Sequence, residues 1–300
     1  MRIGIDLGGT KIEGIVMAPG SRIVERERIA TPQGSYEATL FAIAELVKRL
    51  EAEAGLVGLP VGMGTPGAVS PATGLMKNCN STVLNGKPLK QDLEKILSRE
   101  IRMANDADCL ALSEAADGAA AGARCVFGVI LGTGCGGGVV VNGKLLSGPN
   151  AVAGEWGHNS LPWPRPEWDE VPGPHCWHGG YGCLETWISG SGLAADHQRV
   201  TGSALSAEEI ARRADVGDGA CAATLSRYED RLARSLASVI NLLDPDVIVL
   251  GGGVSQVQRL YRNVPALWDQ WVFSDRVDTR LAPALHGDSS GVRGAAWLWL

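Results

Sequence analysis

The same short unit occurs twice in this chain: an apolar strand, a glycine turn that carries a threonine, and a second apolar strand. Asp6-Leu7-Gly8-Gly9-Thr10 holds the first turn, and Leu131-Gly132-Thr133-Gly134 holds the second. In the first strand, Ile3, Ile5 and Leu7 alternate with smaller or polar residues, which is the period of a half-buried strand. The repeated unit predicts a molecule built from two similar lobes.

Strands and helices alternate along the rest of the chain. Strands are predicted over residues 2–7, 12–17, 22–31, 59–64, 101–104, 125–131, 139–142 and 247–250. Helices are predicted over residues 35–54, 90–99, 107–121, 207–214, 222–243 and 289–300. This order is that of an α/β protein, and we expect the last helix to return to the first lobe. The expected small lobe is residues 1–118 plus 288–300, and the expected large lobe is residues 119–287.

The chain contains neither a functional dinucleotide-binding motif nor a P-loop. Gly62-Gly64-Gly67 and Gly132-Gly134-Gly137 match the spacing G-x-G-x-x-G, but a dinucleotide site also requires a helix directly after the turn. Prolines disrupt the first match, and a strand follows the second. No G-x-x-x-x-G-K-[ST] run exists, so a P-loop is excluded.

The glycine turns themselves are able to bind an anion. Gly8-Gly9-Thr10-Lys11 and Gly132-Thr133-Gly134 can each present backbone N–H groups and a hydroxyl. Two such turns facing each other across a cleft would hold a triphosphate from both sides, although each turn taken alone is more often an ordinary hairpin. Asp6, at the end of the first strand, is well placed to hold Mg²⁺ through water.

Composition and charge argue against some classes of protein. The chain has 300 residues and a formal net charge of −6, whereas a nucleic-acid surface normally shows clustered Lys and Arg. No apolar run reaches the ~18 residues that span a bilayer. Met1-Arg2 leads directly into the first strand without a signal-peptide pattern, so we expect a cytoplasmic protein. Most of the seven cysteines are expected to be buried thiols.

Six motifs together resemble those of the repressor/open-reading-frame/kinase family of sugar kinases. They occur in the family's order over nearly the whole chain: Asp6–Lys11, Asn105–Ala107, Gly132–Gly134, Gly154–His158, Cys176–Glu185 and Leu250–Gly253. Within the family, the chain is most similar to bacterial fructokinases of the manno(fructo)kinase type. This narrower likeness lies in Lys77–Thr82 and His286–Gly294.

The resemblance implies a two-lobed, actin-like (ribonuclease-H-like) fold with ATP in the cleft between the lobes, and it suggests a homodimer. The implied activity is ATP-dependent phosphorylation of a free hexose, in the first place fructose to fructose 6-phosphate. A glucokinase or an N-acetylhexosamine kinase of the same family is the alternative. The residues expected to hold ATP and Mg²⁺ are Asp6, Gly8, Gly9, Thr10, Lys11, Gly132, Thr133, Gly134, Gly252 and Gly253.

The resemblance also assigns the acceptor side of the reaction. Asp106 would be the catalytic base that takes the proton of the sugar hydroxyl, although its position before a helix would equally suit an N-cap. Asn105 would orient the acceptor by hydrogen-bonding a ring hydroxyl. The other expected sugar contacts are Asn80, Glu155, His158, Glu185 and the turn Gly64–Gly67.

Residues 162–182 are rich in Pro, Gly, Trp and His and show no periodicity, so something other than a core should hold them. The family pattern here is a histidine followed by Cys-x-Cys-Gly-x-x-Gly-Cys-x-Glu, and in this chain His178 replaces the second cysteine. His158, Cys176, His178 and Cys183 remain a valid Cys₂His₂ set for a structural Zn²⁺. His175 is a competing ligand, and a metal-free loop with two buried thiols is the alternative.

Two other classes of protein compete with a kinase. Sugar-sensing repressors of the same family carry a winged helix-turn-helix before the first glycine turn, which begins here at residue 8. An actin-like structural or chaperone ATPase would not need Glu155, His158 and Glu185 together. The sequence does not decide which hexose is preferred, because the preference rests on hydroxyl contacts worth only a few kcal/mol.

Overall fold

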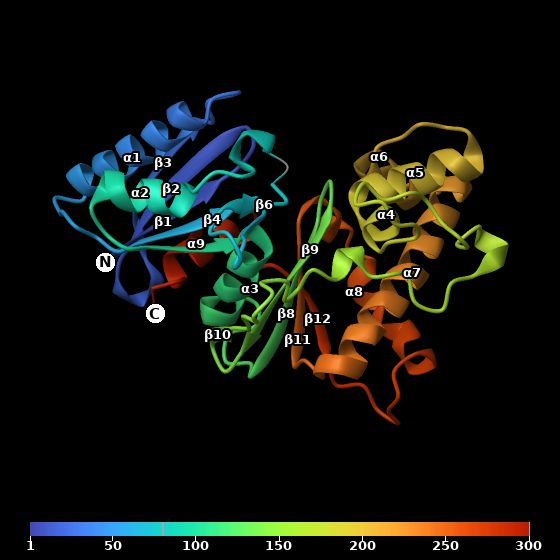
Figure 1. Cartoon of the computed structure of the whole chain (residues 1–300). Helices are drawn as coiled ribbons and strands as arrows, with labels where there is room; N and C mark the ends of the chain where they lie inside the picture. The colour runs from blue at the N-terminus through green and yellow to red at the C-terminus, as the bar shows by residue number, and fades with distance from the viewer. Residues whose placement is uncertain (80, 300) are drawn as a thin grey trace.

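A computed structural model describes residues 1–79 and 81–299 of the chain, which fold around two five-stranded sheets (Figure 1). The first sheet has the order β3-β2-β1-β4-β7, and the second has the order β10-β9-β8-β11-β12. The strands of the first sheet are β1 Arg2–Leu7, β2 Lys11–Met17, β3 Ile23–Ala30, β4 Val61–Thr65 and β7 Ile101–Asn105. Those of the second are β8 Cys125–Leu131, β9 Cys135–Val141, β10 Lys144–Leu145, β11 Val247–Gly251 and β12 Arg280–Pro283.

The two sheets have the same topology. In each, three strands joined by short turns pair antiparallel, and two further strands then add in parallel (β4 and β7 in the first sheet, β11 and β12 in the second). Each glycine turn joins the central strand of its sheet to the neighbouring antiparallel strand. The prediction of two similar halves from the repeated unit is therefore confirmed.

Helices cover both faces of each sheet. The helices are α1 Tyr36–Glu53, α2 Leu89–Leu97, α3 Asp106–Asp117, α4 Glu185–Ile188, α5 Gly190–Thr201, α6 Ala207–Asp215, α7 Gly219–Leu243, α8 Leu260–Asn263 and α9 Ser290–Trp297. On the outer side, α1 and α2 pack on the first sheet and α7 packs on the second, each through a continuous apolar core. Figure 1 shows α9 and α3 together between the two sheets. A two-stranded ribbon, β5 Ala68–Val69 with β6 Met76–Lys77, completes the first half.

The last helix returns to the first sheet, as predicted. Helix α9 lies across β1 and β4 at two glycines, Gly4 and Gly62, where a Cβ atom would overlap the backbone of α9. Helix α3 packs on α9 from the other side, and Gly294 makes this contact possible because a Cβ there would overlap the Cys109 carbonyl. α3 also covers β8 and β9, so it connects the two halves.

Two predicted boundaries are wrong by four residues. Strand β9 begins at Cys135 rather than at residue 139, because Gly136–Gly138 are part of the strand. At Gly138 a Cβ would lie 2.6 Å from the Ala107 carbonyl oxygen, so glycine permits the close approach of α3. Helix α3 ends at Asp117 rather than at residue 121, since the Glu114 carboxylate accepts from the Ala119 N–H (2.8 Å) and ends the helical pattern.

The boundaries of α1 agree with the prediction to within one residue. Ser35 caps the helix, and its Oγ accepts from the Ala38 N–H at 3.2 Å. Helix α5 and strand β12 were not predicted; α5 begins with Gly190-Ser191-Gly192, which gives no helical signal, and its cap is the Ser189 hydroxyl. Among the described residues, no helix is long and apolar enough to cross a membrane.

Candidate active site

Asp106 is the first residue of α3, directly after the end of β7. Its neighbour Asn105 is the N-cap of the helix and accepts from the Asp108 N–H through Oδ1 at 2.6 Å. Asp106 therefore does not cap the helix. The N-cap role, which the sequence also allowed for Asp106, belongs to Asn105. One carboxylate oxygen of Asp106 accepts from the Ala107 N–H (2.8 Å), which holds the side chain in place.

The Asp106 side chain is exposed to solvent. Partial loss of hydration near the surrounding protein atoms, followed by the negative charge of Glu155, raises the pKa of Asp106 above its usual value. A raised pKa makes the carboxylate a stronger base at the pH where it is ionised.

Three further carboxylates lie around Asp106. Burial, together with the charges of Asp106 and Glu13, raises the pKa of Asp6 to about 6. Burial, together with the charges of Glu155 and Asp106, raises the pKa of Asp108 to about 7. The repulsion within this group favours a cation or a set of hydroxyl donors at its centre.

The Asp6 carboxylate is packed closely by glycines. A Cβ at Gly291, in the first turn of α9, would lie 3.1 Å from Asp6 Oδ2, and one at Gly64 would lie 3.7 Å from Oδ1. The half-buried carboxylate has Lys11 and Arg28 as its nearest opposing charges. Asp6 is thus a hard oxygen ligand in negative surroundings, which fits a water-bound Mg²⁺.

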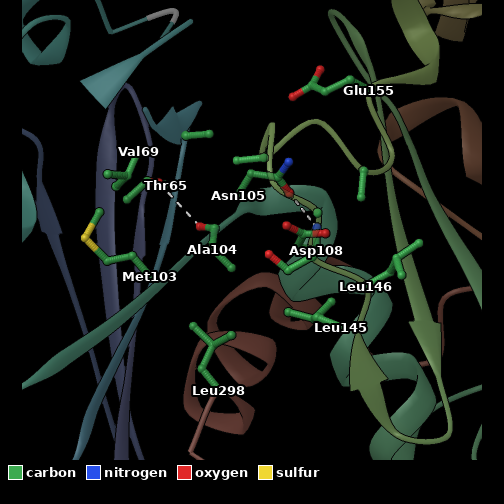
Figure 2. A pocket seen from close by; sticks show the side chains of 15 residues that line it. Thr65, Val69, Met103, Ala104, Asn105, Asp108, Leu145, Leu146, Glu155 and Leu298 are labelled. Carbon is green, nitrogen blue, oxygen red and sulfur yellow. Dashed lines mark hydrogen bonds between the residues drawn. The ribbon is translucent and has the colours of Figure 1, made fainter. Parts of the chain in front are cut away.

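A pocket of about 220 Å³ is lined by residues that include Asn105 and Glu155 (Figure 2). It is lined by both halves of the chain: Thr65 and Val69 come from the first half, while Leu146 and Glu155 come from the second. Thr65 belongs to the turn Gly64–Gly67 that was predicted to complete the sugar pocket. The structure therefore brings Thr65, Asn105 and Glu155 together, as expected for a site that binds one small ligand.

Asp108 also lines this pocket, and sequence reasoning missed it. Its spacing of three residues from Asn105 places both side chains on the same face of the first turn of α3. This three-residue spacing is the sequence feature from which Asp108 could have been predicted as a pocket residue.

Both glycine turns are tight connections closed by a backbone hydrogen bond. In the first turn the Gly8 N–H donates to the Lys11 carbonyl (2.9 Å), and in the second the Gly132 N–H donates to the Gly134 carbonyl (3.0 Å). The threonine of each turn, Thr10 and Thr133, is exposed, as is Lys11. These features agree with the predicted role in binding phosphate.

Gly252 and Gly253 lie next to the second turn. Strands β8 and β11 are parallel neighbours, so their carboxyl ends coincide. Gly252 has a positive φ of 80°, and a Cβ there would lie 2.6 Å from the Leu131 carbonyl oxygen. The predicted adenosine and phosphate positions are thus brought to one edge of the second sheet.

Glu185 also lies at the second turn. Its Oε2 accepts from the Cys135 N–H (3.0 Å), and a Cβ at Gly134 would lie 2.6 Å from the same oxygen. Its Oε1 accepts from the Nε1–H of Trp177 (2.9 Å), whose ring meets the His158 ring edge to face at 5.2 Å. Trp177 is 67% exposed and was not predicted as a site residue. Asn80, the remaining predicted sugar contact, lies outside the described residues.

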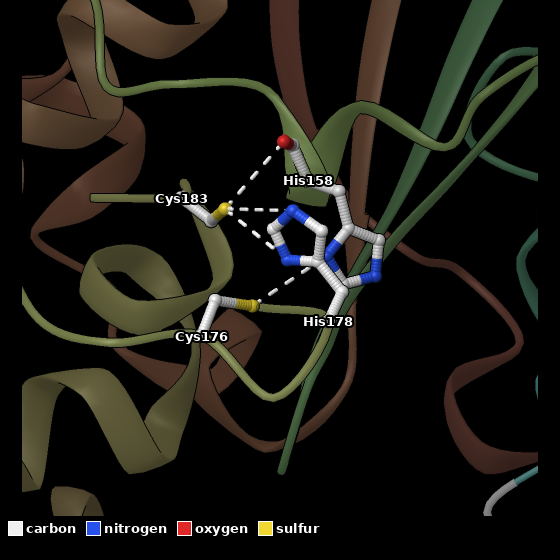
Figure 3. A group of neighbouring side chains, drawn as sticks. All are labelled: His158, Cys176, His178 and Cys183. Carbon is white, nitrogen blue, oxygen red and sulfur yellow. Dashed lines mark hydrogen bonds between the residues drawn. The ribbon is translucent and has the colours of Figure 1, made fainter. Parts of the chain in front are cut away.

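The four predicted zinc ligands converge (Figure 3). One ligand atom from each of His158, Cys176, His178 and Cys183 lies within 4.8 Å of all the others. Cys176 Sγ is 3.7 Å from His158 Nδ1, and Cys183 Sγ is 3.7 Å from His178 Nδ1. Tetrahedral zinc with ordinary Zn–S and Zn–N bonds separates such atoms by about 3.5 Å, so the donor set fits the ion. His175 instead packs on Tyr181 and is not part of the group.

The loop that carries these ligands is also held by buried ion pairs. Glu170 is fully buried and accepts from Arg231 Nε (2.7 Å) and Arg234 Nη2 (2.9 Å), both on α7. Arg234 Nη1 also donates to the carbonyls of Pro162 and Trp163 (2.8 Å each). These ion pairs hold the loop to α7 in addition to any metal. They were not predicted from the sequence.

The chain resembles known proteins over its whole length. The model of the ROK family matches residues 2–300. N-acetyl-D-glucosamine kinase of Pasteurella multocida (strain Pm70) is 41% identical over 303 residues, covering 100% of this chain and 99% of that protein. The N-acetyl-D-glucosamine kinase of Pectobacterium atrosepticum is 38% identical over 302 residues, with the same coverage.

Two solved structures show the same architecture. The ROK hexokinase from Thermus thermophilus has a TM-score of 0.88 and 31% identity, covering 99% of this chain and 96% of that one. A ROK family glucokinase from Streptomyces griseus, in complex with glucose and AMPPNP, has a TM-score of 0.77 and 28% identity, covering 99% and 98%. The predicted two-lobed, actin-like α/β fold is confirmed.

Proposed function

This chain belongs to the ROK family, and from this premise we propose that it transfers the γ-phosphoryl group of ATP to N-acetyl-D-glucosamine, with Asp106 as the catalytic base. At the coarser level it is a sugar kinase that uses ATP and a hexose. The choice of sugar is supported by the N-acetyl-D-glucosamine kinases that resemble the chain over its whole length. The observation that carries the proposal is the Asp106 carboxylate, exposed to solvent at the start of α3 and adjacent in the chain to Asn105, which lines a pocket together with Glu155.

In the proposed mechanism, Asp106 accepts the proton of the sugar hydroxyl as that oxygen attacks the γ-phosphorus. Asn105 and Glu155 orient the sugar from the pocket they share, and Glu185 and His158 supply the remaining contacts. Since the transition state of phosphoryl transfer is loose, positioning and neutralisation of charge supply most of the rate enhancement. Closure of the two halves around the substrates would exclude water and keep hydrolysis of ATP slow.

The nucleotide would be held by both glycine turns. The N–H groups of Gly8–Lys11 and Gly132–Gly134 would bind the phosphates, and Gly252 and Gly253 would lie beside the adenosine. Mg²⁺ bound with ATP would be held by Asp6 through water, where it would neutralise phosphate charge. This cation would also relieve the repulsion that raises the pKa of Asp6.

The Cys₂His₂ group would hold a structural zinc ion. With four protein ligands it has no open position for a substrate, so its role would be to fix His158 and the loop beside Glu185. In the absence of metal, burial and the neighbouring Cys176 raise the pKa of Cys183 to about 11, so binding of zinc would displace a proton.

Fructose is the second candidate substrate. The narrower likeness of Lys77–Thr82 and His286–Gly294 to bacterial fructokinases favours it. In the structure, the start of His286–Gly294 and the preceding Leu285 are hydrogen-bonded to α3. The Glu114 carboxylate accepts from the N–H groups of Leu285 and His286 and from the Ser290 hydroxyl. We also propose that the chain forms two lobes, a small lobe of residues 1–118 plus 288–300 and a large lobe of residues 119–287. We further propose that the protein is a homodimer.

The test is a coupled assay of ADP release with N-acetyl-D-glucosamine, fructose, glucose and mannose at equal concentrations. We expect hexose-dependent ADP release, with N-acetyl-D-glucosamine giving the highest kcat/KM. A higher kcat/KM for fructose would favour the second candidate. Equal release of ADP with and without every sugar would contradict the kinase proposal and favour an ATPase.

A further inference from the structure

Asp108 carries a polar atom that the proposed mechanism does not use. Its Oδ1 is buried and has no hydrogen-bond partner among the described residues. The Asp108 N–H donates to Asn105 Oδ1, and the Asn105 backbone N–H in turn acts on the Asp108 carboxyl group and lowers its pKa, so Oδ1 is the one oxygen left without a partner among the described residues. Burial of a carboxyl oxygen without a partner costs free energy, and such an atom in a native protein calls for an explanation.

The surroundings of Asp108 point to a ligand. The residue lines the pocket of about 220 Å³ together with Asn105 and Glu155, both of which are proposed to hold the sugar. Figure 2 shows the Asp108 side chain on the α3 side of this pocket, below Asn105. The charged groups that act on it are the carboxylates of Glu155 and Asp106, and none of the groups that perturb it is a cation. A salt bridge therefore does not explain its position.

A sugar offers what this site lacks. Each hydroxyl group can donate and accept, so it can pair with a carboxyl group in either state of ionisation. This flexibility matters because burial and the neighbouring charges raise the pKa of Asp108 to about 7, where both states are populated near neutrality. A partner in this position would end the isolation of Oδ1.

We propose that Asp108 is a further sugar-contacting residue, whose carboxyl group pairs with a polar group of the hexose and helps to determine which hexose is accepted. The inference rests on the proposed function for the position of the sugar. Discrimination follows because a site built to pair with a sugar group rejects an analogue that lacks it, leaving a buried atom unpaired.

The test compares Asp108→Ala and Asp108→Asn with the wild type in steady-state kinetics on all four hexoses. For Asp108→Ala we expect the KM of the best hexose to rise at least about tenfold, while the KM of ATP changes less than about twofold. The ratio of kcat/KM between the best and second-best hexose should shift by at least about fivefold. Asp108→Asn keeps the size of the side chain and one carbonyl acceptor. Its hexose KM and its kcat/KM ratio should therefore lie between those of the wild type and Asp108→Ala.

Ser113→Ala is the matched control. Ser113 lies on the same helix, is fully buried and also has a side-chain oxygen without a partner among the described residues, but it does not line the pocket. We expect this variant to leave both KM values unchanged. An Asp108→Ala variant with unchanged kinetics on every hexose would overturn the proposal. So would equal losses on all hexoses without any change in their ratio, because a structural role predicts that result.

Calorimetric titration of sugar into the proteins without ATP separates this inference from the proposed function. If the wild type binds a hexose but does not phosphorylate it, the kinase proposal fails while the role of Asp108 is still measured by the loss of affinity in Asp108→Ala. Equal affinity of the wild type and Asp108→Ala for that hexose would reject the inference alone.

Discussion

Asn105 and Asp106 are adjacent in the chain but have different structural roles at the start of α3. The Asn105 side chain caps α3 by accepting from the Asp108 N–H, and Asp106 occupies the first helical position with one oxygen held by the Ala107 N–H. A short polar side chain before a helix would usually serve as its cap. Because Asn105 supplies this cap, the Asp106 carboxylate is not needed for capping and is exposed to solvent.

We predict that Asp106→Asn folds normally and loses most of its turnover. The amide keeps the shape of the side chain but cannot take a proton, and removal of a general base typically costs ~10²–10⁴ in rate. The KM of ATP should change little. Steady-state kinetics and thermal unfolding provide the measurement, and a variant with more than about a third of the wild-type kcat would contradict the assignment.

The Asp108 carboxyl group should make stability depend on pH. Its folded-state pKa of about 7 is above the ordinary value of 3.8, so the folded protein binds the proton more tightly than the unfolded chain. The resulting stabilisation is complete below pH 4 and is lost as the pH rises through about 7. Asp108→Asn removes this loss, so we expect its stability relative to the wild type to be higher at pH 8 than at pH 4, by up to about 4 kcal/mol at about 1.4 kcal/mol per pKa unit.

Urea unfolding of Asp108→Asn and the wild type at both pH values measures this difference. Asp275→Asn is the control, because Asp275 is exposed in a loop and its substitution should give no pH-dependent change. An Asp108→Asn curve parallel to that of the wild type between pH 4 and pH 8 would contradict the prediction.

Among the elements, the loop of residues 162–182 is held at two places. Toward Glu185, the Cys₂His₂ group gathers His158 and three loop-side ligands. Toward α7, Glu170 is buried against Arg231 and Arg234. The two attachments predict different consequences when each is removed.

We predict about one zinc ion per chain, and Cys183→Ala should release it. Without the metal, His158 loses its fixed orientation, so the KM of the sugar should rise much more than the KM of ATP. His178→Cys should hold zinc at least as well as the wild type, because thiolate is a strong zinc ligand. Elemental analysis of protein never exposed to a chelator is the measurement.

Cys221→Ala is the control for this experiment, since Cys221 is a buried thiol on α7 outside the metal group. Active wild-type protein without stoichiometric zinc would contradict the prediction. In that case Cys176 and Cys183 would be ordinary buried thiols.

We predict that Glu170→Gln destabilises the protein by about 1–3 kcal/mol. The amide removes one negative charge from a buried network, and Arg231 and Arg234 keep only Asp196 (3.0 Å) and Asp230 (2.7 Å) as anionic partners. Glu167→Gln is the matched control in the same loop, because Glu167 is 63% exposed and 3.9 Å from Arg165. Urea unfolding measures both variants, and equal stabilities would contradict the prediction.

At the scale of the whole molecule, the two halves meet through α3 and α9. Helix α9 packs on the first sheet, α3 packs on the second, and the two helices pack on each other (Figure 1). The close approach depends on glycines, because any side chain at Gly4, Gly62 or Gly294 would overlap the backbone of the facing element. The position of Asp106, at the start of α3, follows from this arrangement.

We predict that Gly62→Ala destabilises the protein by about 3 kcal/mol or more, or prevents folding, because its Cβ would overlap the Ala295 carbonyl group of α9. Gly219→Ala is the control, since an added Cβ meets no atom within 4 Å there. Thermal unfolding and the yield of soluble protein measure both variants. A Gly62→Ala protein as stable as the Gly219→Ala protein would show that the packing can yield.

The sequence by itself determined the local elements and the residues that follow from local pattern or resemblance: the strands around both glycine turns, helix α1, Asp106 and the zinc-type ligand set. Strand period, helix caps and turn residues act over a few positions, so they can be recognised in the chain. The tertiary structure decided what depends on contacts between distant segments. Asp108 in the pocket, Trp177 on Glu185, the glycines within β9 and the Glu170 ion pairs all belong to this group. Trp177 and Glu185 are only eight residues apart, but the intervening loop has no regular structure from which their contact could be recognised. The partners of the others lie tens of residues away along the chain, and only tertiary packing brings them together.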